Sequence, residues 1–437
     1  MDYDWGLSRR NLLAAVGSGV LATAAGCLNR VAGQPPNYVP EEAWGFETKG
    51  PILGVPVVSG GRLFVGSDDG YMYALEEEGA GDIADLQDFP MSGYDLRCTN
   101  APDGIEGPRS DVVERWRFDT NGPIRAAPVV WDGALLFGSN DNYFYSVDIA
   151  TGEENWRVDT GSRIMSGASV NDGVVYLGSG LADEHPTSEG GGVFALDVED
   201  GGEIWSVEYD DGVLSPPTYY DGIVYHGDQE NTFVARDAET GEEVWEYESD
   251  RAFCVCRPAI DGESVYIGGE DRKMYSFDVD SGEKEWEFDT GDVVVSSPTV
   301  MDGSVYFGSY DNSVYAVDAD NGEKIWQYET NGAVVSSPAY RGGLLYTGSL
   351  DGAIYALDGN EGELVWGFET DERVASSPLV TEDRIYTGSE DSRLYALTNR
   401  EVPEDVHREH RNAIERRNVT AEDIVEERIR EHYASID

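Results

Sequence analysis

Residues able to do acid–base or metal chemistry are few in this sequence. Histidine occurs at five positions, which are His185, His226, His407, His410 and His432. His407 and His410 share a helical face, but a metal there would need further ligands, and we expect His226, in a strand-like stretch, to be packed. No Gly-x-Ser-x-Gly, phosphate-binding glycine loop or His-Glu-x-x-His motif occurs either. We therefore predict no catalytic residues and no metal site.

The four cysteines offer one candidate thiol site. Cys254 and Cys256 flank a single valine, so strand alternation would place both thiols on the same face. A disulfide between these two would be strained. Two arrangements stay open: a buried, reduced pair, or a disulfide from one of them to Cys98.

Two sets of charged residues recur along the chain. The first is acidic and occupies corresponding turns, at Asp69, Asp141, Glu230, Asp271, Asp311, Asp351 and Asp391. A crown of carboxylates would attract Ca²⁺, although aspartate is also the ordinary residue of tight β-turns. The second set is basic and comprises Arg125, Arg163, Arg251, Arg257 and Arg373. These arginines either receive an anionic ligand or partner at a channel mouth or pair with neighbouring acids.

A repeated stretch must position these residues. The segment from Val305 to Trp326 recurs as Leu345 to Trp366, with a period of about 40 residues and two insertions. Each copy reads as short strands separated by tight Asp/Gly turns. The tryptophans that end equivalent strands are Trp44, Trp116, Trp156, Trp205, Trp245, Trp286, Trp326 and Trp366. Each unit supplies four strands, so the sequence predicts an all-β protein, an eight-bladed β-propeller of four-stranded blades.

The ends of the array predict how the ring closes. The array starts on a tryptophan strand over residues 43–48 and stops after a third-type strand over residues 394–397. The last blade then lacks its outer strand unless the N-terminal strand supplies it. Such a shared blade would lock the ring.

The turn before each tryptophan carries a family resemblance. Ser146-Val-Asp148-Ile-Ala-Thr151-Gly152-Glu-Glu-Asn-Trp156 resembles the tryptophan-docking motif of quinoprotein, or PQQ-like, eight-bladed propellers. Residues 195–205, 235–245, 276–286, 316–326 and 356–366 are similar, and the resemblance covers residues 42–398. In this motif the Asp accepts turn amides, the Gly takes a positive φ and the Trp wedges between blades. We therefore assign the tryptophans to blade docking.

The resemblance implies two classes of function. Some members are dehydrogenases that bind PQQ and Ca²⁺ at the propeller centre, with a catalytic Asp and adjacent cysteines over the cofactor. Others are non-catalytic scaffolds, such as the BamB-like lipoproteins of outer-membrane assembly. This sequence has no adjacent cysteines and little chain beyond the blades for a substrate site. We expect a BamB-like scaffold that binds proteins without a cofactor. The alternative is a PQQ- and Ca²⁺-dependent dehydrogenase acting on alcohols or sugars.

The charge balance restricts the partners. Asp and Glu number 85 against 30 Lys and Arg, a formal net charge of −55. We interpret this acidity as a salt-adapted surface like those of extreme halophiles, because high salt shortens the Debye length to about 3 Å. Such a surface repels nucleic acid and anionic lipid. A haloarchaeon-like source has no outer membrane, so we expect a monomeric propeller whose protein partner lies elsewhere in the envelope.

The first residues read as an export address. Arg9 and Arg10 precede an uncharged stretch and resemble a twin-arginine signal. Ala24-Ala25-Gly26-Cys27 resembles a lipobox, with Ala24 in place of the usual leucine, and plain secretion or a signal anchor is the alternative. We predict an export signal over residues 1–27, lipidation of Cys27, and a tether over residues 28–41. The propeller over residues 42–398 would then be anchored at the extracellular face of the cell membrane.

Three segments depart from the repeat. Insertions over residues 76–113 and 180–192 either carry function or are solvated acidic loops without a ligand. Residues 400–437 carry apolar residues at helical spacing and six arginines between Arg408 and Arg430. We predict a short helical tail there, docked on the ring in cis.

Overall fold

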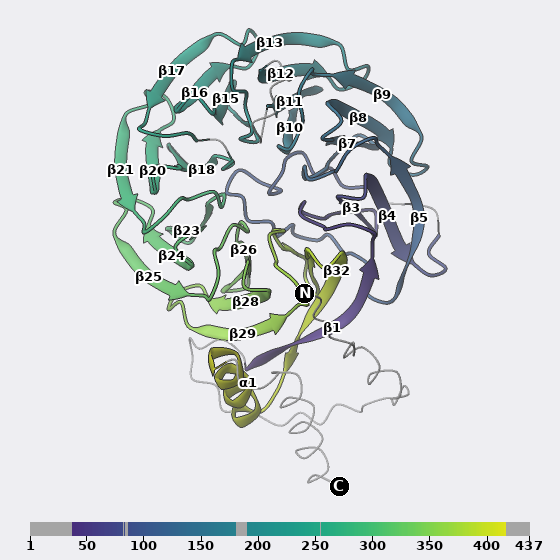
Figure 1. Cartoon of the computed structure of the whole chain (residues 1–437), viewed down its shortest axis with the longest axis vertical. Helices are drawn as coiled ribbons and strands as arrows, with labels where there is room; N and C mark the ends of the chain where they lie inside the picture. Colours follow the sequence, from purple (N-terminus) through teal and green to yellow (C-terminus); the bar gives the residue numbers. More distant parts are fainter. Residues whose placement is uncertain (1–36, 82, 84–85, 181–189, 254, 417–437) are drawn as a thin grey trace, which may run out of the picture. The chain divides into compact units, whose positions relative to one another are not determined.

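Eight four-stranded antiparallel sheets form a ring of blades (Figure 1). The computed structural model describes residues 37–81, 83, 86–180, 190–253 and 255–416. From blade 1 to blade 8, the innermost strands are β2 (Val57–Ser59), β6 (Val129–Trp131), β10 (Ala168–Asn171), β14 (Thr218–Tyr220), β18 (Ala259–Asp261), β22 (Thr299–Met301), β26 (Ala339–Arg341) and β30 (Leu379–Val380). The second strands are β3 (Arg62–Gly66), β7 (Ala134–Gly138), β11 (Val174–Ser179), β15 (Ile223–Gly227), β19 (Ser264–Gly268), β23 (Ser304–Ser309), β27 (Leu344–Ser349) and β31 (Ile385–Gly388). The third strands are β4 (Tyr71–Glu77), β8 (Tyr143–Asp148), β12 (Gly191–Asp197), β16 (Thr232–Asp237), β20 (Lys273–Asp278), β24 (Ser313–Asp318), β28 (Ala353–Asp358) and β32 (Arg393–Glu401). The outer strands are β5 (Val112–Asp119), β9 (Glu154–Asp159), β13 (Glu203–Tyr209), β17 (Glu243–Glu248), β21 (Lys284–Asp289), β25 (Lys324–Glu329), β29 (Leu364–Glu369) and β1 (Tyr38–Glu47).

Blade 8 combines the two ends of the propeller. β1 pairs antiparallel with β32, from Tyr38 opposite Glu401 to Glu47 opposite Arg393. Figure 1 shows the purple β1 beside the yellow β32. The predicted all-β eight-bladed ring, closed by an N-terminal strand, is confirmed.

The tryptophan of a blade docks on the blade that follows it. Trp286 Nε1 donates to Ala319 O at 2.9 Å, and a Cβ on Gly322 would lie 2.8 Å from the indole ring. Gly322 also has a φ of 72°. A glycine is therefore required both by the close approach of the indole ring and by the backbone conformation. Glycines at five further junctions cover the preceding tryptophan in the same way, and these are Gly152, Gly201, Gly241, Gly282 and Gly362.

Every outer strand carries a β-bulge directly before its tryptophan. In blade 6, Ala316 lies opposite Trp326 and Val317 lies opposite Lys324, so Ile325 has no partner in the ladder. A bulge twists the strand and interrupts its row of free backbone groups. The outer edges of the blades are therefore poor templates for a further strand.

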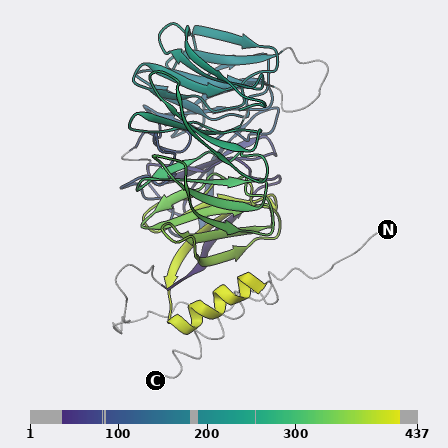
Figure 2. The ribbon, with the colours of Figure 1, turned by 90° about the vertical axis from the view of Figure 1, so that its left-hand side faces the viewer.

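The helix α1 (Glu404–Arg416) packs on the outer strand β29 of blade 7, beside the ring in Figure 2. His407 Nε2 lies 2.7 Å from Val365 O, and Ile414 fills the space that a Cβ on Gly367 would enter. This agrees with a tail that docks in cis, although the apolar spacing predicted over residues 424–436 lies outside the described residues. Within the described part of the chain, no helix is long and apolar enough to cross a membrane.

Candidate functional site

The insertion over residues 76–113 is not a solvated loop, which corrects that alternative. Its residues 86–109, called the plug here, cross the centre of the ring, where Figure 1 shows them as a slate-blue trace. Backbone hydrogen bonds join the plug to the inner strands of blades 2, 3, 5, 6, 7 and 8. The bonded pairs are Phe89 with Val130, Ser92 with Ala168, Leu96 with Ile260, Arg97 with Val300, Thr99 with Tyr340, and Asn100 with Val380. The plug therefore lines the inner strands on the face of the ring where the first and second strands are linked. The opposite face, formed by the loops leading into each inner strand, is called the mouth.

Arg257 anchors the plug from inside the channel. Its Nη1 donates to Asp95 O and Cys98 Sγ, both at 3.1 Å, and its Nη2 lies 2.7 Å from Met91 Sδ. The side chain is 2% exposed. Gly93 makes room for it, since a Cβ there would lie 2.6 Å from Nη1, and Gly93 has a φ of 86°. Arg257 is thus a contact of the plug and does not join the other arginines at the mouth.

The two described channel cysteines are free and buried. Burial raises the pKa of the Cys98 thiol to about 11, against the opposing effect of the Arg257 charge. Burial also raises the pKa of Cys256, whose Sγ lies 3.2 Å from Val294 O. Both thiols are therefore protonated near neutral pH and are poor nucleophiles. Cys254 lies outside the described residues.

The remaining predicted arginines are spread around the mouth. Arg125 forms a two-point ion pair with Asp68, with both nitrogen–oxygen distances at 2.8 Å. Arg163 leads into blade 3, Arg251 into blade 5 and Arg373 into blade 8. The structure therefore does not bring the five predicted arginines together into one anion site.

The recurrent acids form contacts between blades. Asp311 Oδ2 accepts from Tyr315 in its own blade at 2.7 Å and from the backbone of Gly291 in the loop of the preceding blade, also at 2.7 Å. The same tyrosine contact recurs at Asp69, Asp141, Asp271, Asp351 and Asp391. These carboxylates stabilise the junctions, which is the turn alternative and not the cation crown. A sequence signal existed for this contact, since a tyrosine follows each of these six acids at the fourth position.

The junction between blades 3 and 4 has different chemistry. Arg236 occupies a position that is Val317 in blade 6, and it donates to Tyr209 Oη at 2.6 Å and His226 Nε2 at 3.3 Å. His226 is fully buried, as expected from its strand, and burial with the Arg236 charge lowers its pKa to about 3. Burial raises the pKa of nearby Asp228 to about 6. This cluster is a buried polar network that no signal in a single repeat reveals.

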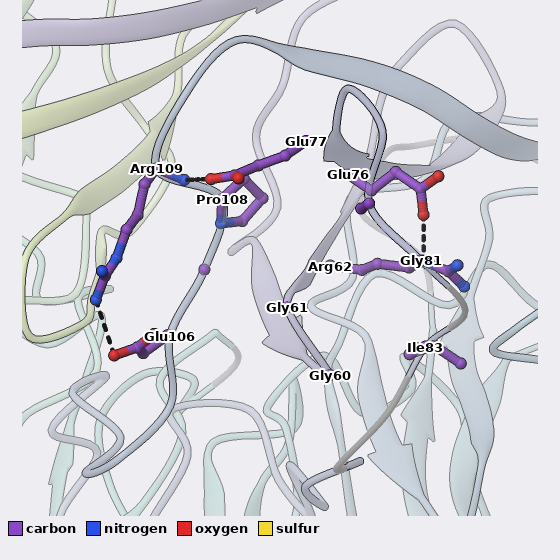
Figure 3. A pocket seen from close by; sticks show the side chains of 12 residues that line it. Gly60, Gly61, Arg62, Glu76, Glu77, Gly81, Ile83, Glu106, Pro108 and Arg109 are labelled. Carbon is purple, nitrogen blue, oxygen red and sulfur yellow. Dashed lines mark hydrogen bonds and ion pairs between the residues drawn. The ribbon is translucent and has the colours of Figure 1, made fainter.

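A pocket of about 320 Å³ lies where the chain leaves blade 1 for the plug (Figure 3). Arg62 Nε and Glu76 Oε2 lie 2.7 Å apart at its wall, and both side chains are nearly fully buried. Glu77 accepts from the backbone of Arg109, whose guanidinium pairs with Glu106 at 2.8 Å. The charged side chains around the pocket are therefore all engaged with the chain itself.

This pocket marks a missing docking turn. Glu76 stands where Asp148 in blade 2 accepts the amides of a docking turn, but the plug departs from blade 1 at that point. The tryptophan that faces this junction, Trp44, donates to Pro108 O at 3.0 Å in place of a turn carbonyl. The pocket thus arises where the ring closes around the plug, and its lining indicates no particular ligand.

The described residues do not fit a PQQ and Ca²⁺ site. PQQ is a polycarboxylate and would need free cationic groups in the channel, whereas Arg257 is engaged with the plug. Among the described residues, no group of three or more His, Cys, Asp or Glu side chains is placed to hold a metal ion. Cys98 and Cys256 belong to the plug and to blade 5, so they cannot supply adjacent cysteines.

The predicted export and lipid sites are not within the described part of the chain. Arg9, Arg10 and Cys27 all precede residue 37, and most of the second insertion, residues 181–189, is likewise outside it.

Many solved structures share this fold, and three of them illustrate its range. They are BamB from Moraxella catarrhalis (TM-score 0.62, 17% identity, 82% of this chain and 99% of that one), the computationally designed Ika8 protein (0.63, 16%, 83% and 100%), and a europium-containing methanol dehydrogenase (0.64, 13%, 82% and 93%). An assembly factor, a designed protein and an enzyme thus have the same architecture, which by itself selects none of these functions.

The sequence alone gives a narrower result. No curated protein matches it. The family model described as outer membrane protein assembly factor BamB matches residues 109–184, 147–254, 251–339 and 332–404, which together span more than half of the chain. The chain belongs to the family of outer membrane protein assembly factor BamB.

Proposed function

We propose that this chain is a non-catalytic propeller scaffold that binds protein partners in the cell envelope. The proposal rests on what the channel side chains that depart from the repeat contact. Arg257 stands where other blades have Ser297, Ser337 and Ser377, and both its Nη1 and its Nη2 contact the plug. The channel side chain that would have to bind a cofactor thus serves to hold the fold together.

The anchoring proposed for the scaffold rests on the sequence of the first residues. Export through the signal containing Arg9 and Arg10 and lipidation at Cys27 would hold the propeller at the extracellular face of the membrane. The net charge of −55 supports a salt-rich surrounding, where self-repulsion is screened. The family description, which refers to outer-membrane assembly, supports an envelope location at the coarse level.

A PQQ-dependent dehydrogenase is the second candidate, because a methanol dehydrogenase shares the fold. We propose that the chain uses neither PQQ nor Ca²⁺, since its channel residues do not fit them. Reconstitution with both in high salt tests this directly. A quinone absorbance change together with dye-linked alcohol oxidation would overturn the scaffold proposal.

The partner is proposed to dock at the mouth. The bulged outer strands disfavour strand addition at the rim, and the plug occupies the opposite face. The test places a photo-crosslinking residue at Tyr310, which is 44% exposed in a mouth turn, or at Asp103 on the plug face. In native envelopes we expect one discrete protein adduct at Tyr310 and none at Asp103. Adducts at Asp103 only, or at neither position, would contradict docking at the mouth.

A further inference from the structure

A ring of apolar side chains surrounds the mouth of the channel. In seven repeats, one apolar residue precedes the small residue that faces the next blade, and these are Leu53, Met165, Leu214, Val255, Val295, Val335 and Ala375. Arg125 holds the position in blade 2. Val295 is partly exposed although Val294 and Ser296 on either side of it are fully buried, and Val255 is 45% exposed.

Hydrogen bonds one residue further along place these positions side by side. Ser215 Oγ donates to Cys256 O at 2.6 Å, and Cys256 Sγ lies 3.3 Å from Ser296 O. Ser296 Oγ donates to Ser336 O at 3.1 Å, and Ser376 Oγ donates to Gly54 O at 2.8 Å. The apolar residues before them therefore follow one another from blade 4 to blade 7 and from blade 8 to blade 1, and Arg125 interrupts the series in blade 2.

Six of the seven side chains are partly or well exposed, whereas Leu214 is buried. None of them belongs to the hydrophobic clusters that the described residues form between the blades. The residue one place earlier behaves differently: Val294, Val334 and Val374 are buried against a glycine of the neighbouring second strand. An apolar surface that is contiguous and unpacked marks a docking site far more often than scattered exposed residues do.

The access to the apolar ring and the charges around it indicate what kind of ligand binds there. The plug occupies the inner strands on the other face of the ring, so we place the occupant at the mouth. The loops that lead to the apolar ring carry six exposed carboxylates, at Asp210, Asp211, Asp250, Asp292, Asp371 and Glu372. The basic residues on these loops are Lys49, Arg163, Arg251, Arg373 and the ion-paired Arg125, so acids outnumber the remaining cations. These acids attract cationic groups and repel anionic lipid.

We propose that this apolar ring is the docking site for a protein partner, which inserts a segment of apolar residues flanked by Lys or Arg. The inference rests on the proposed scaffold function and states the chemistry of the partner. Apolar side chains of the segment replace water at the ring, while its cationic flanks face the acidic loops.

The test measures binding of labelled peptides to the full chain by fluorescence anisotropy in high-salt buffer. Three peptides of equal length are compared: a Leu/Val core with Lys flanks, the same core with Glu flanks, and a Gly/Ser core with Lys flanks. We expect saturable binding of the first only. Val295→Asn with Val335→Asn should weaken it by at least about tenfold, because two apolar contacts are lost.

The matched control is Ile325→Asn, since Ile325 is 48% exposed on the outer strand of blade 6. It should change the affinity less than twofold. If the double variant unfolds, Val295→Thr with Val335→Thr preserves shape and should still weaken binding. Equal binding of the Gly/Ser or Glu-flanked peptide, an equal loss in the Ile325 control, or no saturable binding would overturn the inference. A crosslinked envelope partner that persists in the Val295/Val335 variant would reject the apolar ring while leaving the scaffold function intact.

Discussion

The two faces of the ring are held together by contacts of different kinds. At the mouth the contacts repeat: the bond from the Gly291 amide to Asp311 of the next blade has equivalents at Asp69, Asp141, Glu230, Asp351 and Asp391. On the plug face one insertion contacts six blades, and its anchor, Arg257, occurs once. Repeated contacts share the stabilisation among many junctions on both faces, because the tryptophan-docking turns lie beside the links between first and second strands. The plug adds contacts that are concentrated in a few coupled residues.

This difference between the two faces indicates which residues serve folding and which serve partner binding. A face built from a unique insertion with buried anchors has few side chains left for a partner. The mouth keeps its stability in repeated contacts, so its exposed positions are free to vary. Substitutions on the plug face should therefore affect folding first, and substitutions at the apolar ring should affect binding first.

The largest effect is expected for Gly93→Ala. The new Cβ would lie 2.6 Å from Arg257 Nη1 and 3.2 Å from Cys98 Cα, on a residue with a φ of 86°. We expect the free energy of unfolding to fall by about 3 kcal/mol, because backbone strain and the displacement of a buried guanidinium add together. Chemical denaturation in high salt measures the change.

Two controls isolate the contribution of the plug. Gly161→Ala introduces a Cβ at a φ of 75° in a mouth loop with nothing within 4 Å, and should cost only about 1 kcal/mol. Arg257→Ser restores the residue of the neighbouring repeats and removes the clashing group. In that background, Gly93→Ala should cost less than in the native chain, although the contact at 3.2 Å with Cys98 Cα remains. An equal cost for Gly93→Ala with and without Arg257 would show that the two residues are not coupled.

The next effect concerns pH and blade 4, whose inner strand lacks backbone bonds to the plug among the described residues. Burial raises the pKa of Asp228 to about 6, above the value near 4 of an unfolded aspartate. The folded state therefore holds its proton more tightly, and the stability present below pH 4 is lost as pH rises to 6. We expect Asp228→Ser, which restores the usual residue, to remove a dependence of roughly 2 kcal/mol across this window.

Unfolding free energies at pH 4.5 and pH 7, at one salt concentration, measure this dependence. The control is Ser309→Ala, which alters the same repeat position in blade 6 without touching a titrating group. It should keep the pH dependence of the native chain. An Asp228→Ser variant that also keeps it would show that another group is responsible.

Much of the fold could be predicted because each blade is encoded by one copy of a sequence repeat. The spacing of the tryptophans predicted eight blades, and the mismatch at the two ends predicted closure by β1 and β32. The docking turns were predictable for the same reason: Asp318, Gly322 and Trp326 keep a fixed spacing. Asp318 accepts amides of its own turn, while Gly322 and Trp326 contact the blades on either side.

The contacts around the channel could not be predicted in this way. Arg257 was grouped with the mouth arginines because of its place in the repeat, but its direction depends on a plug that lies 160 residues away along the chain. The path of the plug follows from contacts with six blades, and no local pattern encodes them. The apolar ring was also missed, because one apolar residue per repeat looks like ordinary core until its exposure is known.

The smallest effects test whether the mouth contacts are independent. Tyr145 and Tyr315 each donate to an aspartate at 2.7 Å, in blades 2 and 6. Tyr145→Phe should lower the free energy of unfolding by about 1 kcal/mol, because one hydrogen bond to a carboxylate is lost while the ring stays packed. Tyr315→Phe should lower it by at least as much, because Gln327 Nε2 also donates to Tyr315 Oη at 3.2 Å. The double variant should show the sum of the two losses within about 0.5 kcal/mol, since the sites share no partner. Denaturation of the four chains under one condition completes this cycle. A coupling as large as that expected between Gly93 and Arg257 would mean that the mouth, like the plug face, depends on a single cooperative contact network.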